Sequence, residues 1–169
     1  MTVAKRVVVV CHANTARSVM AQKLIERMLA DRDLAGAIHV SSAGVWSYAR
    51  DGMIPSLDAR LALREVGIEL AEDAMVSTAL RDHPEVLAGA DLVVTMTNEQ
   101  KGLVLALANG RGVTVATLPE LAGEHGDIAD PAGQGEEAFR AARDEIMRCL
   151  ALGFDALVAR VISSLDHGG

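Results

Sequence analysis

The chain of 169 residues has a formal net charge of −7, and half of its residues are hydrophobic although only 2% are aromatic. The acidic balance argues against nucleic acid or an anionic membrane surface as a partner, and no apolar run reaches the roughly 18 residues that a membrane span needs. The length predicts one domain, residues 1–169, with an aliphatic core. The first apolar run is too short for a signal peptide, and cysteines are few, so we expect a location in the reducing cytoplasm.

Strand and helix signals alternate from the start of the chain. The run of valines that ends on Cys11 predicts a strand buried on both faces, as in a parallel sheet. Apolar residues at helical spacing predict a helix that begins near Ser18. A second strand is expected at 38–42. A turn region with Gly44, Gly52 and Pro55 follows, and then a helix that begins at Ser56 and is stopped by Gly67.

The second half of the chain continues this alternation. We expect a strand at 91–96, a helix from Asn98 to about Ala108, a strand at 113–118, a long loop at 119–135 and a last helix at 136–165. Strands that alternate with helices predict right-handed crossovers. The expected fold is therefore a single-domain α/β structure of three layers, a doubly wound sheet of four parallel strands in the order 2-1-3-4 flanked by helices.

The loop between the first strand and the first helix, residues 11–18 (the Cys11 loop), is the strongest functional signal. It begins at the carboxyl end of a strand, where ligands bind in such sheets. A tight loop that opens a helix can turn its backbone N–H groups inward around an anion. The same field favours the thiolate of Cys11, and Arg17 can match two oxygens of a phosphate. The alternative is a small core cysteine and a solvated arginine.

The segment VCHANTARSVMAQ, residues 10–22, resembles the low-molecular-weight protein tyrosine phosphatase family, whose loop reads Cys-x-Gly-Asn-x-Cys-Arg-Ser-Pro. The resemblance continues through SSAGVW at 41–46, ADLVVTMTNEQ at 90–100 and HGDIADP at 125–131. The chain departs from the family pattern at Ala13, Ala16 and Val19, where the family has Gly, Cys and Pro.

The resemblance implies a protein phosphatase that works through a cysteinyl-phosphate. Cys11 is then the nucleophile, Arg17 the phosphate clamp and Asp130 the general acid and base, and Asp127 is expected to be a capping or turn residue. The substrate is a phosphorylated protein or peptide, the product is inorganic phosphate, and neither metal nor cofactor is expected. The phosphate-binding residues expected in the loop are His12, Ala13, Asn14, Thr15, Ala16, Arg17 and Ser18.

Other residues receive roles from the same resemblance. Asn14 is expected to hold a left-handed turn, with Ser42 as its partner, and Ser18 to hydrogen-bond the thiolate of Cys11. Ala13 is compatible with the loop only if its φ is negative. Ala16 removes the cysteine that in the family can trap an oxidised nucleophile, and Cys149 is expected to lie in the core.

Substrate-binding residues are expected at Thr15, Trp46 and Tyr48. For the two aromatic residues the alternative is core packing, but a Trp on a loop flanked by glycines favours substrate contact. Phosphotyrosine is the family's usual substrate. Phosphoarginine is the alternative, because Thr15 resembles the protein-arginine phosphatases of the family and no aromatic residue follows Asp130-Pro131. A reductase of the arsenate type needs three cysteines, and only Cys11 and Cys149 are present. A phospho-residue binding module that no longer hydrolyses its ligand is the non-enzymatic alternative.

Overall fold

The valines of the first strand fill both faces of a central sheet. The computed structural model describes residues 3–163, in which β1 (Lys5–Cys11) pairs in parallel with β2 (Ile38–Gly44) and with β3 (Leu92–Thr95). β4 (Val115–Thr117) pairs in parallel with β3 and completes the order β2-β1-β3-β4. This is the topology expected from the sequence.

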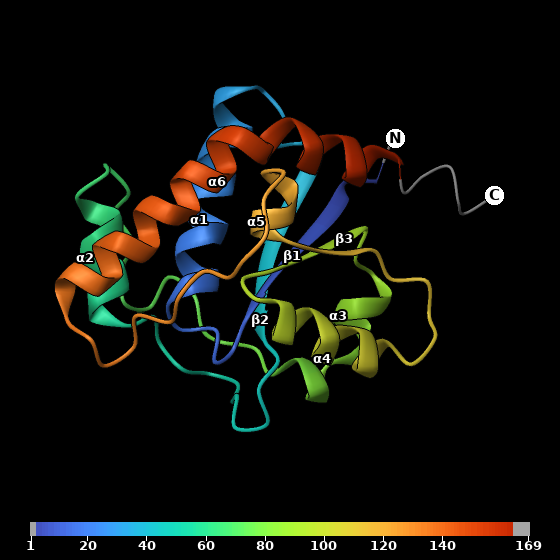
Figure 1. Ribbon diagram of the computed structural model, residues 1–169, viewed down its shortest axis with the longest axis horizontal. Coiled ribbons are helices and arrows are strands. Elements are labelled where there is room, and N and C mark those ends of the chain that lie inside the picture. The colour runs from blue at the N-terminus through green and yellow to red at the C-terminus, as the bar shows by residue number, and fades with distance from the viewer. Residues whose placement is uncertain (1–2, 164–169) are drawn as a thin grey trace.

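Alternate side chains of β1 enter two separate cores. Val7, Val9 and Cys11 face one core, whose helical residues come from α1 (Arg17–Asp31), α2 (Leu57–Arg64) and α6 (Glu136–Ser163). Val8 and Val10 face the other core, with residues from α3 (Pro84–Ala88) and α4 (Asn98–Ala108). Figure 1 shows the two groups of helices on opposite sides of the strands, which gives the three expected layers.

The predicted long loop and two predicted strand boundaries were wrong in part. Residues Leu118–Leu121 form a short helix, α5, because the Thr117 side chain accepts from Glu120 N and Pro119 is tolerated in a first helical turn. The fourth strand is accordingly shorter than 113–118. At the other edge, Gly44 belongs to β2 and not to the following turn.

Two short elements have no counterpart in the sequence prediction. A 3₁₀ turn, η1 (Leu80–Asp82), and α3 (Pro84–Ala88) lie between the second helix and the third strand. The predicted end of the last helix at 165 lies outside the described residues. The predicted helix from Asn98 to Ala108 is confirmed, and it ends at Asn109 with a φ of 48°. Within residues 3–163, every helix is too short or too polar to cross a lipid bilayer.

The end of β2 supports the Cys11 loop from behind. A Cβ atom on Gly44 would lie 2.8 Å from the carbonyl oxygen of His12 and 2.9 Å from the carbonyl carbon of Ala13. Such distances are shorter than ordinary van der Waals contact, so only glycine allows the loop to approach the strand this closely. The packing thereby fixes where the loop lies at the carboxyl edge of the sheet.

Candidate active site

Asn14 organises the inside of the Cys11 loop. It is buried and has a φ of 63°, a left-handed conformation that asparagine tolerates. Its Oδ1 accepts from Thr78 N at 3.0 Å, and its Nδ2 donates to Ser18 Oγ at 2.8 Å and to Ser42 Oγ at 2.9 Å. The Asn14–Ser42 contact and the left-handed turn expected from the sequence are therefore present. Ala13 does not have a positive φ, so the missing glycine causes no backbone strain there.

Backbone atoms of the next segment hold the loop from outside. Val45 N donates to Cys11 O at 3.0 Å, Trp46 N to His12 O at 3.1 Å, and Ser56 N to Thr15 O at 2.9 Å. In contrast, the backbone N–H groups of residues 12–17 donate to no acceptor within residues 3–163. The loop therefore uses its carbonyls in hydrogen bonds to the next segment and leaves its N–H groups unbonded in the described part of the chain, an arrangement typical of anion-binding loops.

The sulfur of Cys11 lies at the bottom of this loop. Its side chain is 3% exposed, and its Sγ is 3.0 Å from Ser18 Oγ. Ser18 Oγ accepts from Asn14 and from the Cys11 thiol, and a thiolate at Cys11, which can only accept, would take the hydroxyl hydrogen of Ser18 instead. Of the residues expected in the loop, Ala16 is buried at the start of α1, whereas His12, Ala13 and Thr15 are half-buried.

Arg17 connects the Cys11 loop with the segment that carries Asp130. Its side chain is only 3% exposed, its Nη1 donates to Ile128 O at 2.7 Å, and its Nη2 lies 3.6 Å from Asp130 Oδ2. Ile128 is buried in the core, and its N–H donates to Met96 O. The guanidinium is therefore fixed from one side while the Asp130 carboxylate, 45% exposed, stays at the rim.

The two carboxylates of the 127–130 segment have different surroundings. Asp130 Oδ1 accepts from Ala132 N at 3.0 Å. Asp127 Oδ1 accepts from Asn98 N at 2.8 Å, at the first residue of α4. Asp127 thus caps a helix, as expected from the sequence, and only Asp130 of this pair forms an ion pair with Arg17.

Aromatic side chains form one wall beside the loop. The rings of His12 and Trp46 are 4.2 Å apart, and those of Trp46 and Tyr48 are 5.8 Å apart in an edge-on arrangement. Trp46 is half-buried, whereas Tyr48 is 57% exposed. The two aromatic residues that are expected to bind substrate, Trp46 and Tyr48, therefore lie on the wall that begins at His12.

The side chain of His12 is the feature that sequence reasoning missed. Its Nδ1 lies 3.0 Å from Gln100 Nε2, while Gln100 Oε1 accepts from both Met96 N and Thr97 N. The amide orientation of Gln100 is thus fixed, and Nδ1 of His12 must accept. Burial, followed by the positive charge of Arg17, lowers the pKa of His12 below its ordinary value. His12 is a neutral imidazole with its hydrogen on Nε2.

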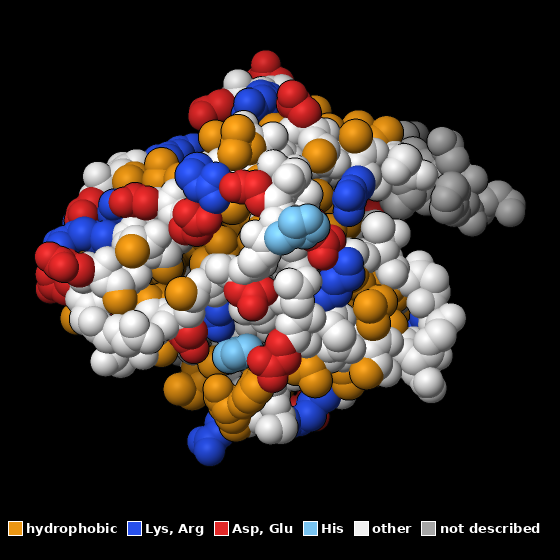
Figure 2. Space-filling view, viewed as in Figure 1, with side chains coloured by type: hydrophobic (Ala, Val, Ile, Leu, Met, Phe, Trp, Pro, Cys, Tyr) orange, Lys and Arg blue, Asp and Glu red, His pale blue; other side chains and the backbone are white. Residues whose placement is uncertain are grey.

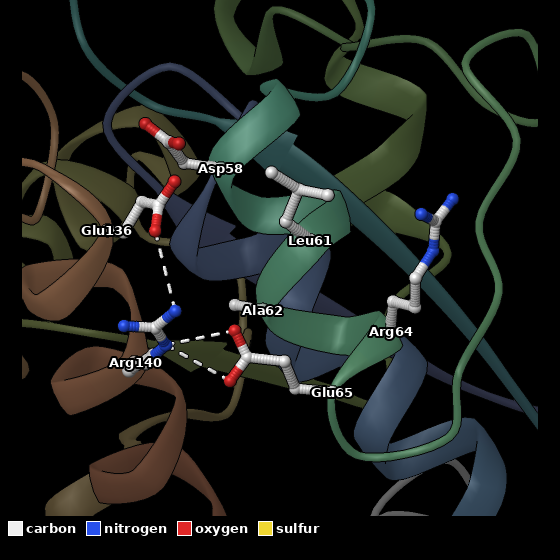
Figure 3. Close-up of a pocket in the computed structure, with 7 residues that line it drawn as sticks. All are labelled: Asp58, Leu61, Ala62, Arg64, Glu65, Glu136 and Arg140. Atoms are coloured by element: carbon white, nitrogen blue, oxygen red, sulfur yellow. Dashed lines mark hydrogen bonds and ion pairs between the residues drawn. The ribbon is translucent and has the colours of Figure 1, made fainter.

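A pocket between α2 and α6 offers no comparable chemistry (Figure 3). Arg140 lies between two carboxylates there, with Nε at 2.9 Å from Glu65 Oε1 and Nη2 at 3.4 Å from Glu136 Oε2. These contacts raise the pKa of Arg140 and lower that of Glu65, each chiefly through their mutual hydrogen bond. The pocket is therefore occupied by paired charges. Within the described part of the chain, no three His, Cys, Asp or Glu side chains are grouped to hold a metal ion.

Comparisons with known proteins agree with this geometry. Residues 6–161 match the family described as low molecular weight phosphotyrosine protein phosphatase. A protein-arginine-phosphatase of Geobacillus stearothermophilus is 36% identical over 142 residues, which are 83% of this chain and 88% of that protein.

Solved structures of protein phosphatases are also similar to this chain. The YwlE arginine phosphatase from Geobacillus stearothermophilus has a TM-score of 0.77 and 34% identity, with 98% of each chain covered. A low molecular weight protein tyrosine phosphatase from T. tengcongensis has a TM-score of 0.78 and 29% identity, covering 90% of this chain and 99% of that one.

Proposed function

Because the chain belongs to the low molecular weight phosphotyrosine protein phosphatase family, we propose that Cys11, Arg17 and Asp130 hydrolyse phosphorylated side chains of proteins. Members of this family are cysteine-dependent protein phosphatases, and so is this protein. One observation supports this assignment of catalytic residues more strongly than the others. Arg17 extends from the loop that holds Cys11 and reaches within 3.6 Å of Asp130.

Substrate binding uses the positive field of the Cys11 loop. The free N–H groups of residues 12–17 and the N-terminal end of α1 surround the phosphoryl oxygens. Arg17 offers two parallel N–H bonds to the same oxygens. As charge builds on the equatorial oxygens during transfer, these donors stabilise it without having to reorient.

The first chemical step transfers the phosphoryl group to sulfur. The Cys11 thiolate forms a bond to phosphorus while the bond from phosphorus to the substrate oxygen or nitrogen breaks. The leaving atom takes the electron pair and receives a proton from the Asp130 carboxyl group. Ser18, which lies 3.0 Å from Sγ and is held by Asn14, donates a hydrogen bond to the thiolate before the attack.

The second step releases inorganic phosphate. Asp130, now a carboxylate, removes a proton from water as that water attacks phosphorus. The phosphorus–sulfur bond breaks, and the electron pair returns to Cys11 as thiolate. The catalyst is thereby restored, with the substrate hydrolysed by one water molecule.

For the substrate we favour phosphoarginine, with phosphotyrosine as the second candidate. Thr15 is a half-buried loop residue with a hydroxyl group, and Ala132-Gly133, which have no aromatic ring, follow Pro131. Both features suit a polar guanidinium better than an apolar phenol, and the relative from Geobacillus stearothermophilus is named for phosphoarginine. The wall of Trp46 and Tyr48 is the observation that favours phosphotyrosine.

The test is kcat/KM on phosphoarginine and phosphotyrosine peptides of otherwise identical sequence, with p-nitrophenyl phosphate as a small substrate and Cys11→Ser as the inactive control. We expect Thr15→Ile to lower the phosphoarginine-to-phosphotyrosine ratio by about tenfold, the size of one lost polar contact. An unchanged ratio would show that Thr15 does not determine the preference between the two substrates. Phosphate binding with no turnover of any substrate would identify a binding module and overturn the proposed reaction.

A further inference from the structure

A groove between the β2–α2 segment and α4 adjoins the Cys11 loop (the α4 groove). It has a volume of about 460 Å³ and is lined mainly by Val45, Trp46, Leu103 and Leu107, with Arg81 and Glu99 among its polar residues. This volume is in the range of pockets that hold ligands of peptide side-chain size or larger. In Figure 2 hydrophobic side chains gather at the lower edge of the molecule, over the segment that joins β2 to α2.

The lining of the α4 groove is apolar and open to solvent. Leu107 is 41% exposed on α4, and both Trp46 and Leu103 are half-buried. Leu105, on the same helix, is similarly exposed at 46%, but it does not line the groove. Burial of one more apolar side chain between Trp46 and Leu107 would remove apolar surface of both from water.

The α4 groove and the Cys11 loop meet at His12. The ring of His12 stacks on Trp46 of the groove at 4.2 Å, while its backbone belongs to the loop. Its titration is influenced by Arg17 and Asp130 on one side and by Glu99 of the groove on the other. A polypeptide that leaves the loop toward the groove must therefore pass His12.

His12 has a hydrogen-bond donor available at this junction. Its Nδ1 is occupied by Gln100, and its Nε2 has no partner within residues 3–163. Among these residues Arg60 Nε is the only buried side-chain nitrogen or oxygen without a partner, so Nε2 of His12 reaches solvent. Glu99 on the groove wall is exposed and forms no ion pair with another described residue. A donor and an acceptor thus flank the passage, which suits the carbonyl and N–H groups of an extended peptide.

We propose that the α4 groove binds the part of the phosphoprotein substrate next to its phosphorylated residue. An apolar side chain of that segment lies between Trp46 and Leu107, and Nε2 of His12 donates to a main-chain carbonyl. The proposal rests on the proposed function, because only a phosphorylated polypeptide occupies the loop and the groove together. An extended chain advances about 3.3 Å per residue, so three residues on either side of the phosphorylated one reach about 10 Å from it.

The experiment compares two substitutions on one helix. Phosphopeptides with a single leucine at each of the three positions before and after the phosphorylated residue, in a serine background, identify the preferred position in the wild-type protein. Leu107→Asp is expected to lower kcat/KM on the preferred peptide about tenfold, mostly through KM. The reason is that the leucine of the peptide loses its apolar contact with Leu107. Leu105→Asp is the matched control and leaves the same value unchanged. Both variants keep wild-type turnover of p-nitrophenyl phosphate, which has no flanking chain.

A second measurement addresses His12. His12→Leu is expected to lower the ratio of kcat/KM on the preferred peptide to that on p-nitrophenyl phosphate. Two results would overturn the groove proposal in a protein that still hydrolyses p-nitrophenyl phosphate. One is an equal kcat/KM for the leucine and serine peptides, and the other is an equal effect of Leu107→Asp and Leu105→Asp. A wild-type protein that hydrolyses no phosphorylated compound would instead overturn the proposed function, and the groove proposal with it.

Discussion

Asn14 Nδ2 donates a hydrogen bond to Ser18 Oγ at 2.8 Å, and this contact holds the serine hydroxyl beside Cys11. As a thiol, Cys11 Sγ donates to Ser18 Oγ at 3.0 Å; as a thiolate it can only accept, so the hydroxyl hydrogen of Ser18 then turns to the sulfur. A hydrogen bond donated to the sulfur favours the thiolate over the thiol. The left-handed turn at Asn14, which asparagine and glycine adopt easily, is therefore linked through Ser18 to the charge state of Cys11.

Ser18→Ala removes that hydrogen bond with little change in volume. We expect iodoacetamide to alkylate Cys11 at pH 6 about tenfold more slowly, since a hydrogen bond to a charged group is worth about 1.5–3 kcal/mol. Loss of activity should parallel the slower alkylation. Cys149 is buried and serves as the internal reference, measured by mass spectrometry. Equal alkylation rates for the variant and the wild type would mean that Ser18 does not hold the thiolate.

Asp130→Ala should lower kcat by about 10²–10⁴ because the leaving group loses its proton donor. Phosphate binding should persist, since Arg17 remains held by Ile128. The comparison is Asp127→Asn, which keeps an acceptor for Asn98 N and alters no group in the proposed reaction. We expect Asp127→Asn to retain wild-type kcat. Stopped-flow measurement of p-nitrophenol release distinguishes the two variants, and a wild-type rate for Asp130→Ala would exclude it as the acid.

Peroxide should inactivate the protein without recovery by dithiothreitol. The oxidised sulfur of Cys11 has no partner cysteine in the loop, because Ala16 stands where the family has Cys. Cys149 cannot replace it, since it lies in the core on α6 and burial raises the pKa of its thiol. Ala16→Cys should restore recovery through a disulfide to Cys11. Full recovery of the wild-type protein after mild peroxide would contradict this expectation, and inorganic phosphate should protect Cys11 in both proteins.

His83 should make stability depend on pH near neutrality. Its Nε2 lies 2.8 Å from Asp51 Oδ2 and its Nδ1 lies 3.0 Å from Glu85 Oε1, and these hydrogen bonds raise the pKa of His83. A raised pKa in the folded state stabilises the protein below the unfolded value of about 6.5, and this contribution is lost as pH rises through the folded pKa.

His83→Gln tests this contribution. The Tm of the wild type should exceed that of the variant most at about pH 6 and should approach it by about pH 8.5. The pKa of Asp51 is lowered by Ala79 N–H and by His83, so part of the advantage should also disappear in acid. Calorimetry at fixed ionic strength measures the difference, and a constant Tm difference from pH 6 to 8.5 would contradict the assignment.

The parts of the fold that follow hydrophobic periodicity could be predicted from the sequence. β1, with four consecutive valines, and α4, with its Thr97–Gln100 capping box, carry strong local signals. The Asn14 turn was predicted through family resemblance, and its φ confirms it. α3 and α5 were missed because helices this short have almost no periodicity; each has a proline in its first turn, and only α5 has a side-chain cap, from Thr117.

The His12–Gln100 contact could not have been predicted, because it joins residues separated by 88 positions. It depends on the parallel pairing of β1 with β3, which places the end of one strand beside the start of the helix after the other. The capping box of α4 can be recognised in the sequence, and it predicts the contacts of the Gln100 side-chain oxygen. It does not predict the contact of the side-chain nitrogen. The position of His12 beside Trp46 therefore follows only from the assembled sheet.

Gly44 has a consequence for engineering and for natural variation. Any side chain at this position would come within 3.0 Å of the backbone of His12 and Ala13, at 2.8 Å and 2.9 Å, so the Cys11 loop would have to shift. A substitution there would leave every residue of the proposed reaction in the sequence and still displace the backbone of the Cys11 loop. A homologue could thus become catalytically silent through a single methyl group placed behind the loop, with its recognisable motif untouched.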